Sequence, residues 1–309
     1  MTESCPVPEL KTGPSKREGA CSILSQRAAE PLTGTAFTDS RWLLVEHPGP
    51  WPSQAVDTAL PAETLAEVRD RAPGVRLALI RRPQARSVDA PVAFLAGGRP
   101  DAWLRRVQLQ RYGDLVDLDL EAIADGREPA DGERITEPTF FVCTHGRREV
   151  CCAEFGRPVM RAIATGGFAP WEITHIGGDR FAASMVVFPL GHYFGHLNPV
   201  SGLSAARKYA TDRLQLGNVR GRSGYPNSVQ TAELFLRERL SALGLHDATV
   251  LSWHERDEQA GVDIRVLDDH YRVELTRQRH PEQLVNGCSD DAVRIPRWYW
   301  VAKEWNKLG

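Results

Sequence analysis

Three thiols, an imidazole and a carboxylate lie close together in one stretch of the sequence. Cys143, Cys151 and Cys152 belong to the run CTHGRREVCC, and His175 and Asp179 begin and end the run HIGGD. Thiolate and imidazole are ligands of zinc and of iron–sulfur clusters, and they are also the reactive groups of thiol redox centres. Almost nothing else in the sequence resembles reactive chemistry, so we expect the function to reside here.

Each run follows a predicted strand. The segments Thr139–Cys143 and Trp171–His175 are typical of buried strands, and they would place a thiol and an imidazole at the carboxyl edge of one sheet. Ligand sites of open α/β folds gather at that edge. Gly177 and Gly178 would allow a close backbone approach and leave amide N–H groups free to bond bridging sulfides. The pattern predicts a four-point cradle on two neighbouring loops.

The composition restricts the class of protein. The chain has 309 residues, 42% hydrophobic and 25% charged, which is ordinary for a globular protein of one large or two compact domains. A net charge of −2 argues against a general nucleic-acid binder and a polybasic membrane anchor. No apolar run approaches the roughly 20 residues of a membrane helix, and no secretory signal is visible. We therefore expect a cytoplasmic protein without nucleic-acid or membrane partners.

The chain has six cysteines. In a reducing compartment a cysteine cluster more often binds metal or performs catalysis than forms disulfides. Cys5, Cys21 and Cys288 stand alone in their segments, so we expect them to be small buried or surface residues rather than ligands.

The hydrophobic pattern predicts an α/β fold with thioredoxin-like layers, built as two α/β units with the cluster site in the second. Residues 1–30 read as an irregular leader with a possible helix at Ala20–Arg27, residues 31–123 as an N-terminal α/β domain, and the charged, glycine-bearing residues 124–137 as a linker. Residues 138–309 read as the cluster-binding domain, and the spacing of Trp298, Val301 and Trp305 predicts a C-terminal helix. Two successive layers are compatible with a duplicated fold.

Further elements are predicted by periodicity. The helices are Ala62–Arg71, Glu154–Ala164, a short one around Phe181, Ser201–Leu214 and Thr231–Leu243. The strands are Trp42–His47, Arg76–Arg81, Val92–Ala96, Met185–Phe188, one after the turn at Pro189, Thr249–Glu255, Val262–Val266 and Tyr271–Arg277, with Leu115–Leu120 a strand or a turn.

The runs CTHGRREVCCA, HIGGDRFA and PLGHYFG resemble the sucrase/ferredoxin-like family, whose members are thioredoxin-like ferredoxins. The resemblance is strong over Thr139–Pro199 and looser from Arg41 to the C-terminus. In that family a [2Fe–2S] cluster is held by two cysteines with eight residues between them and by the histidines of a His-Xaa-Gly-Gly-His motif. The resemblance implies ligands at Cys143, Cys152 and His175, with Cys151 at a non-ligand position.

Asp179 replaces the second histidine of that motif. A carboxylate is a hard anionic ligand that iron(III) accepts, and it would make the centre more negative than a bis-histidine one. More negative charge disfavours reduction, so the potential should lie between those of bis-histidine and all-cysteine centres. Alternatively, Asp179 pairs with Arg180 or Arg148, and the fourth ligand is His145, His192, Cys151 or water.

Other groups near the motif are predicted to assist. His192 and His196 are spaced like zinc ligands on a helix, but Gly191 and Gly195 favour a strand and turn, with His192 near the cluster rim. Positive side chains would offset the charge of a reduced cluster or dock an acidic redox partner. They are Arg147, Arg148, Arg180, Arg207, Lys208, Arg220 and Arg222.

The first hypothesis is an electron-transfer protein with one [2Fe–2S] cluster that passes single electrons between redox partner proteins. An external reductase is required, because no Walker loop or Gly-Xaa-Gly-Xaa-Xaa-Gly motif follows a strand. A second hypothesis is a thiol–disulfide or peroxide-handling enzyme that uses Cys151 or Cys152 as nucleophile. A third is a structural zinc-binding module.

Overall fold

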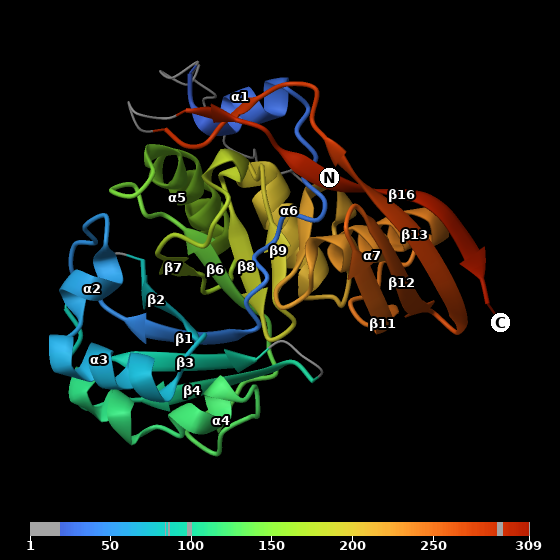
Figure 1. Cartoon of the computed structure of the whole chain (residues 1–309). Coiled ribbons are helices and arrows are strands. Elements are labelled where there is room, and N and C mark those ends of the chain that lie inside the picture. Colours follow the sequence, from blue (N-terminus) through green and yellow to red (C-terminus); the bar gives the residue numbers. More distant parts are fainter. Residues whose placement is uncertain (1–18, 84, 86, 98–100, 289–292, 309) are drawn as a thin grey trace, which may run out of the picture.

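A ten-stranded mixed sheet runs through most of the protein (Figure 1). The structure, a computed structural model, describes residues 19–83, 85, 87–97, 101–288 and 293–308. The strands lie in the order β10-β9-β8-β6-β7-β2-β1-β3-β4-β5. Their bounds are β1 Arg41–Glu46, β2 Arg76–Arg81, β3 Val92–Gly97, β4 Trp103–Gln108, β5 Glu133–Arg134, β6 Thr139–Cys143, β7 Trp171–Ile173, β8 Met185–Phe188, β9 His192–Phe194 and β10 Val219–Arg222.

The same pattern of four paired strands occurs twice in this sheet. In the first half β1 pairs in parallel with β2, while β3 and β4 continue the other side of β1 as antiparallel neighbours. In the second half β6 pairs in parallel with β7, and β8 and β9 continue antiparallel beyond β6. The halves meet where β2 pairs antiparallel with β7. The α/β class expected from the sequence is confirmed, and both expected units belong to one continuous sheet.

Helices connect and cover the strands. Their bounds are α1 Cys21–Arg27, α2 Ala55–Ala59, α3 Ala62–Arg71, α4 Leu120–Ala124, α5 Val150–Thr165, α6 Pro199–Tyr209 and α7 Asn227–Leu240, with 3-10 helices η1 Tyr112–Asp117, η2 Asp179–Phe181 and η3 Leu216–Asn218. None of the helices in the described parts of the chain combines the length and apolarity needed to cross a bilayer.

Strands with apolar residues on both faces lie at the centre of the sheet. β1 and β3 are buried along almost their whole lengths, as expected for strands covered on two sides. The side chains of one face pack around Trp42, Phe94 and Phe141, and those of the other face pack under α3 or under α5 and α6. The parallel connection β6–α5–β7 therefore lies in a fixed position, with the carboxyl ends of β6 and β7 side by side.

A second, four-stranded antiparallel sheet lies beside the first. It contains β11 Ala248–Arg256, β12 Gln259–Val266, β13 Asp269–Arg279 and β16 Trp298–Lys307, in that order. Helix α7 contacts β10 of the first sheet and all four strands of the second. The buried Glu233 of α7 forms ion pairs with Arg222 at 3.0 Å and Arg237 at 2.9 Å, which compensates the two buried guanidinium groups.

Several sequence predictions need correction. The C-terminal segment is strand β16, paired with β13 from Trp298 to Lys307, and not a helix. The predicted strand or turn at Leu115–Leu120 contains the last three residues of the 3-10 helix η1 and the first residue of α4, and β4 was not predicted. Glu133 and Arg134, which lie within the predicted linker 124–137, pair with β4 and extend the sheet. The linker and the domain boundaries at 31–123 and 138–309 stay predictions.

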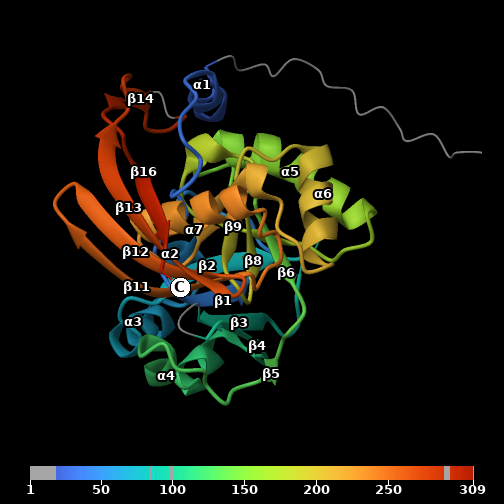
Figure 2. The same ribbon diagram turned by 90° about the vertical axis from the view of Figure 1, so that its right-hand side faces the viewer.

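The N-terminal end of the described chain lies beside the segment of β14, Leu284–Val285, and β15, Arg294–Ile295. Helix α1 contacts η2 and β14, and β14 pairs with β15. Figures 1 and 2 both show α1 beside this C-terminal segment, above α5. Residues 19–30 are thus ordered as a helix and a buried turn, whereas residues 1–18 of the predicted leader, Cys5 included, lie outside the described residues.

Candidate metal centre

Strand β6 ends at Cys143, which is 1% exposed. Its backbone N–H donates to the carbonyl of Ser184 at 2.9 Å, and the N–H of Thr144 donates to the carbonyl of Ile173 at 3.2 Å. The sheet ladder thus continues up to this thiol and holds its position. The backbone N–H of His145 donates to the Cys143 sulfur, as expected for a group that stabilises a thiolate.

Helix α5 begins at Val150 and supplies Cys152 from its first turn. Unpaired N–H groups and the helix dipole favour negative charge at this end of a helix. Gly156 lies one turn further and packs directly on the backbone carbonyl of Cys143, where a Cβ would overlap the oxygen. This close contact brings the start of α5 against the end of β6.

The two thiols and the ring of His175 converge at this point. Each of Cys143, Cys152 and His175 offers one ligand atom within 4.8 Å of the other two. A hydrogen bond from Cys152, together with His175, lowers the pKa of Cys143 well below the usual thiol range and outweighs burial. The same hydrogen bond and burial raise the pKa of Cys152. Cys143 is therefore the first of the pair to become a thiolate.

His175 and Asp179 form a second pair of donors. The Nδ1 of His175 lies 2.8 Å from an Oδ1 of Asp179, and neither buried atom has a hydrogen-bond partner among the described residues. Burial disfavours the imidazolium, but the hydrogen bond to Cys143 and the charge of Asp179 outweigh it and raise the pKa of His175. Burial raises the pKa of Asp179 to about 6, against the opposing effect of His175.

The turn between these two residues requires glycine. Gly177 and Gly178 have φ values of +83° and +75°, a region that L-residues seldom adopt. A Cβ on Gly177 would lie 2.7 Å from the ring of Phe37, and one on Gly178 would overlap the guanidinium of Arg220. Neither glycine's N–H has a partner among the described residues, so both amides are free to bond an anion.

The side chain of Arg220 packs against this turn and holds it by a hydrogen bond. Its guanidinium donates to the carbonyl of Gly177 at 3.0 Å and to the hydroxyl of Thr35 at 3.2 Å. The side chain is only 2% exposed, and burial lowers its pKa to about 10. Of the arginines predicted to supply positive charge, Arg220 is the one buried directly beneath the Gly177–Gly178 turn.

The first half of the sheet positions the His175 loop. Arg76 of β2 donates to the carbonyl of His175 at 3.1 Å, and the backbone N–H and carbonyl of Leu79 both bond Thr174. From the other side, the N–H of His175 donates to the ring Nδ1 of His145 at 3.4 Å, and that ring bonds the carbonyl of Pro52. The N-terminal half therefore positions the site without providing a metal ligand to it.

The remaining predicted site residues occupy other positions. Arg148 is exposed on the turn before α5, where its charge lowers the pKa of Asp179, although no ion pair links the two. His192 is buried in β9 and bonds the hydroxyl of Tyr209 at 2.8 Å. It lies opposite Val187, which pairs with Phe140, towards the other end of β6.

Two proposed pairings of the site are wrong. Arg180 pairs with Glu30 at 2.5 Å rather than with Asp179, so the carboxylate of Asp179 stays with His175. The sulfur of Cys151 points to a different group, in which it lies 3.6 Å from the sulfur of Cys21. Cys151 is therefore no candidate for completing the set of four donors.

Cys151 belongs to a second thiol group that the sequence did not predict. Cys21, Cys151 and Cys288 each place a sulfur within 4.8 Å of the other two. Cys21 and Cys288 therefore do not stand alone, contrary to the expectation from their isolated positions. No spacing motif marks this group, because its three members come from segments that are far apart in the sequence.

The residues of the first site fit a [2Fe–2S] cluster by their chemistry. The donors that lie within 4.8 Å of one another are Cys143, Cys152 and His175, and Asp179 joins them through its 2.8 Å contact with His175. Ligands of one metal atom at bond lengths near 2 Å are separated by about 3 Å, which the 2.8 Å pair matches without a hydrogen bond between them. The free amides of the glycine turn could bond bridging sulfides.

Fold and site together define an α/β protein with a buried thiol–imidazole–carboxylate site at the carboxyl ends of two parallel strands. Residues 32–205, more than half of the chain, match the sucrase/ferredoxin-like family, and the chain belongs to that family. No curated protein and no solved structure matches the chain. The family expected from the sequence motifs is thereby confirmed.

Proposed function

We propose that this protein is an electron carrier with one [2Fe–2S] cluster held by Cys143, Cys152, His175 and Asp179. The observation that favours it most is the convergence of Cys143, Cys152 and His175 within 4.8 Å, with Asp179 in contact with the Nδ1 of His175 at 2.8 Å. When bound, the cluster would accept and release one electron at a time. The repeated βαβ unit with its antiparallel hairpin supports a thioredoxin-like description of each half.

The protein residues have distinct tasks in this proposal. Cys143 and Cys152 provide two negative ligands, and Asp179 a third, while the buried Arg220 offsets part of that charge. The free N–H groups of Gly177 and Gly178 would stabilise the negative sulfides. Each effect favours an anionic centre at this partly buried site.

A hollow beside the site suits an acidic redox partner. It is bounded by the loop after Cys143 and by the first half of the sheet, and its lining includes three arginines. Complementary charge speeds the encounter of electron-transfer proteins. The lining residues are Pro50, Trp51, Pro52, Ser53, Arg81, Thr144, His145, Gly146, Arg147 and Arg157.

The thiol–disulfide alternative has less support. Cys151 and Cys152 are 0% and 3% exposed, so neither offers an accessible nucleophile, and their sulfurs belong to different groups. A nucleophilic cysteine has to be partly exposed to meet its substrate.

The test is anaerobic reductive titration of the purified protein, followed in the visible spectrum. We expect bleaching complete at about one electron per chain, and no bleaching in Cys143→Ser. The control is Asp125→Asn, which removes an exposed carboxylate outside the site and should still take up the electron. A colourless protein that binds zinc through Cys143 and accepts no electron would favour the zinc module and contradict the proposal.

A further inference from the structure

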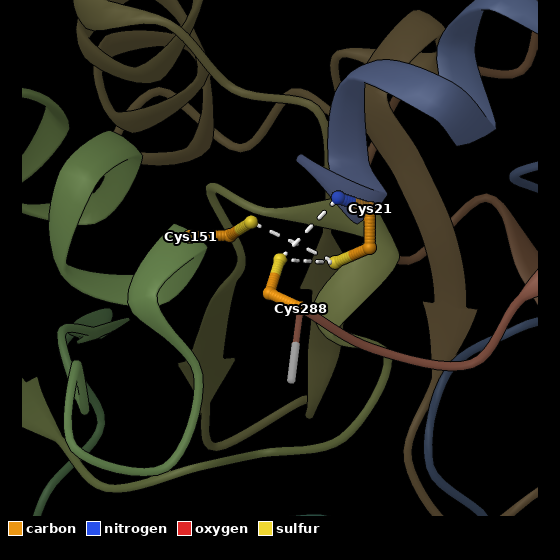
Figure 3. Close-up of side chains that lie close together, drawn as sticks. All are labelled: Cys21, Cys151 and Cys288. Atoms are coloured by element: carbon orange, nitrogen blue, oxygen red, sulfur yellow. Dashed lines mark hydrogen bonds between the residues drawn. The ribbon is translucent and has the colours of Figure 1, made fainter. Parts of the chain in front are cut away.

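The three thiols of Cys21, Cys151 and Cys288 come from segments that are far apart in the sequence (Figure 3). Cys21 is the first residue of α1, Cys151 lies in the first turn of α5, and Cys288 follows β14. The Cys288 sulfur lies 3.0 Å from that of Cys21, which in turn lies 3.6 Å from that of Cys151. All three cysteines are free thiols.

Backbone N–H groups around these sulfurs favour the thiolate form of the cysteines. The N–H of Cys21 donates to the sulfur of Cys288 at 3.3 Å, and the N–H of Ser22 donates to the sulfur of Cys151. The N–H of Cys288 is held by the carboxylate of Glu149, which directly precedes α5, at 2.8 Å. Cys21 and Cys151 are 1% and 0% exposed, so water does not stabilise these polar sulfurs.

Three converging thiols in a buried position fit one soft metal ion. Thiolates select zinc, copper(I) or iron–sulfur clusters. In a tetrahedral zinc site with bonds near 2.3 Å the sulfurs are about 3.8 Å apart. The 3.6 Å between Cys21 and Cys151 is close to this value, whereas the 3.0 Å between Cys21 and Cys288 would have to widen on binding. The nearby N–H groups point at the thiols themselves rather than at a space for bridging sulfides, which favours a single ion.

We propose that Cys21, Cys151 and Cys288 bind one zinc ion, at a site separate from the cluster ligands. The fourth position opens to a hollow beside Cys21, so a water molecule can complete the tetrahedron. The hollow is lined by Cys21, Leu24, Ser25, Arg27, Ala28, Glu30, Glu282, Leu284, Val285 and Arg294.

The zinc ion would fasten α1 and the segment after β14 beside the first site. Helix α1 packs against η2, which begins with Asp179, and Glu30 just after α1 pairs with Arg180 of η2. The fully buried apolar cluster of this region is small and consists of Ala20, Cys21, Cys151 and Ala182, with Ile23, Phe155, Val285 and Cys288 packed against it. A bound metal ion would add stability to this cluster.

The test measures zinc and iron separately in anaerobically purified full-length chains. We expect about one zinc per chain in the wild type, and a loss of at least about tenfold in zinc affinity in Cys21→Ser and Cys288→Ser, both retaining iron. The matched control is Cys143→Ser/Cys152→Ser, which should lose iron and retain zinc. This opposite pattern distinguishes failure of the zinc proposal from failure of the proposed function.

Cobalt(II) gives a spectroscopic readout that does not require the Cys21→Ser or Cys288→Ser variant to fold. When cobalt(II) is titrated into the Cys143→Ser/Cys152→Ser protein, it should produce the charge-transfer absorption of a cobalt ion bound by three thiolates. Zinc should displace the cobalt and remove this absorption. Zinc content unchanged by Cys21→Ser would overturn the proposal. So would copper in place of zinc, iron retained by the double variant, or a Cys21–Cys288 disulfide in wild-type protein without metal.

Discussion

Cys151 and Cys152 are adjacent in the sequence, yet their sulfurs belong to two different groups of donors. Cys152 joins Cys143 and His175, whereas Cys151 joins Cys21 and Cys288. Both lie in the first turn of α5, where successive side chains point about 100° apart. One helix terminus thus positions both groups, and its unpaired N–H groups favour thiolates in each.

The contact between α5 and β6 makes Gly156 a sensitive position. In Gly156→Ala the new methyl group would overlap the carbonyl of Cys143 and force the start of α5 away from β6. We expect a loss of about 1–3 kcal/mol in the free energy of unfolding, because a backbone contact cannot yield as a side chain does. Cys152 would shift with the helix, so iron content should fall as well.

Chemical denaturation and iron analysis check this prediction. Gly217→Ala is the matched control, since a Cβ there meets nothing within 4 Å and the residue has no positive φ. Gly156→Ala protein with wild-type stability and full iron content would show that the helix contact does not position Cys152.

Asp179 determines the charge of the centre in this account. Asp179→His replaces an anionic ligand by a neutral one and gives the His-Xaa-Gly-Gly-His motif of the family. The reduction potential should therefore rise. Potentiometric titration measures the change, with Asp125→Asn, which removes an exposed carboxylate elsewhere, as the control. An unchanged potential in Asp179→His would argue that residue 179 does not bind the centre.

His196 makes stability depend on pH. Burial, with Arg220 and Arg180 nearby and against the effect of Glu30, lowers its pKa to about 4. The unfolded chain takes up this proton below its ordinary pKa near 6.5, whereas the folded chain does so only near 4. The free energy of unfolding should therefore fall by about 1–3 kcal/mol as the pH drops through this window.

Denaturation of the His196→Asn variant at several pH values checks this effect. Asparagine tolerates the positive φ of +49° at this position, and it cannot take up the proton. The decline between pH 6.5 and 4 should be smaller in this variant, but unchanged in His246→Asn, whose side chain is 74% exposed. Equal declines in wild type and His196→Asn would exclude His196 as the source.

Local patterns predicted much of the fold and of the first site. Buried strands such as Arg76–Arg81 and the helix Ala62–Arg71 have the bounds expected from periodicity. Cys143, Cys152 and His175 converge as expected, because each follows or begins an element of one βαβ unit. The bounds of these elements and the convergence of these side chains depend mainly on residues that are close together in the sequence.

Long-range pairing was beyond the reach of those patterns. Trp298, Val301 and Trp305 fit helical spacing, but pairing with β13 makes their segment a strand. Likewise, Cys21 and Cys288 meet across 267 positions of sequence, and no local signal marks that contact. The position of His192 away from the site follows from strand register, which the sequence did not specify.

The most direct test of the proposed centre is pulsed electron paramagnetic resonance of the anaerobically reduced protein. We expect the reduced cluster to be paramagnetic and to show magnetic coupling to the nitrogen of one histidine ligand, His175. This coupling should be lost in His175→Cys. A signal with two histidine ligands, a signal without nitrogen coupling, or no paramagnetic iron in a protein with full metal content would contradict this account.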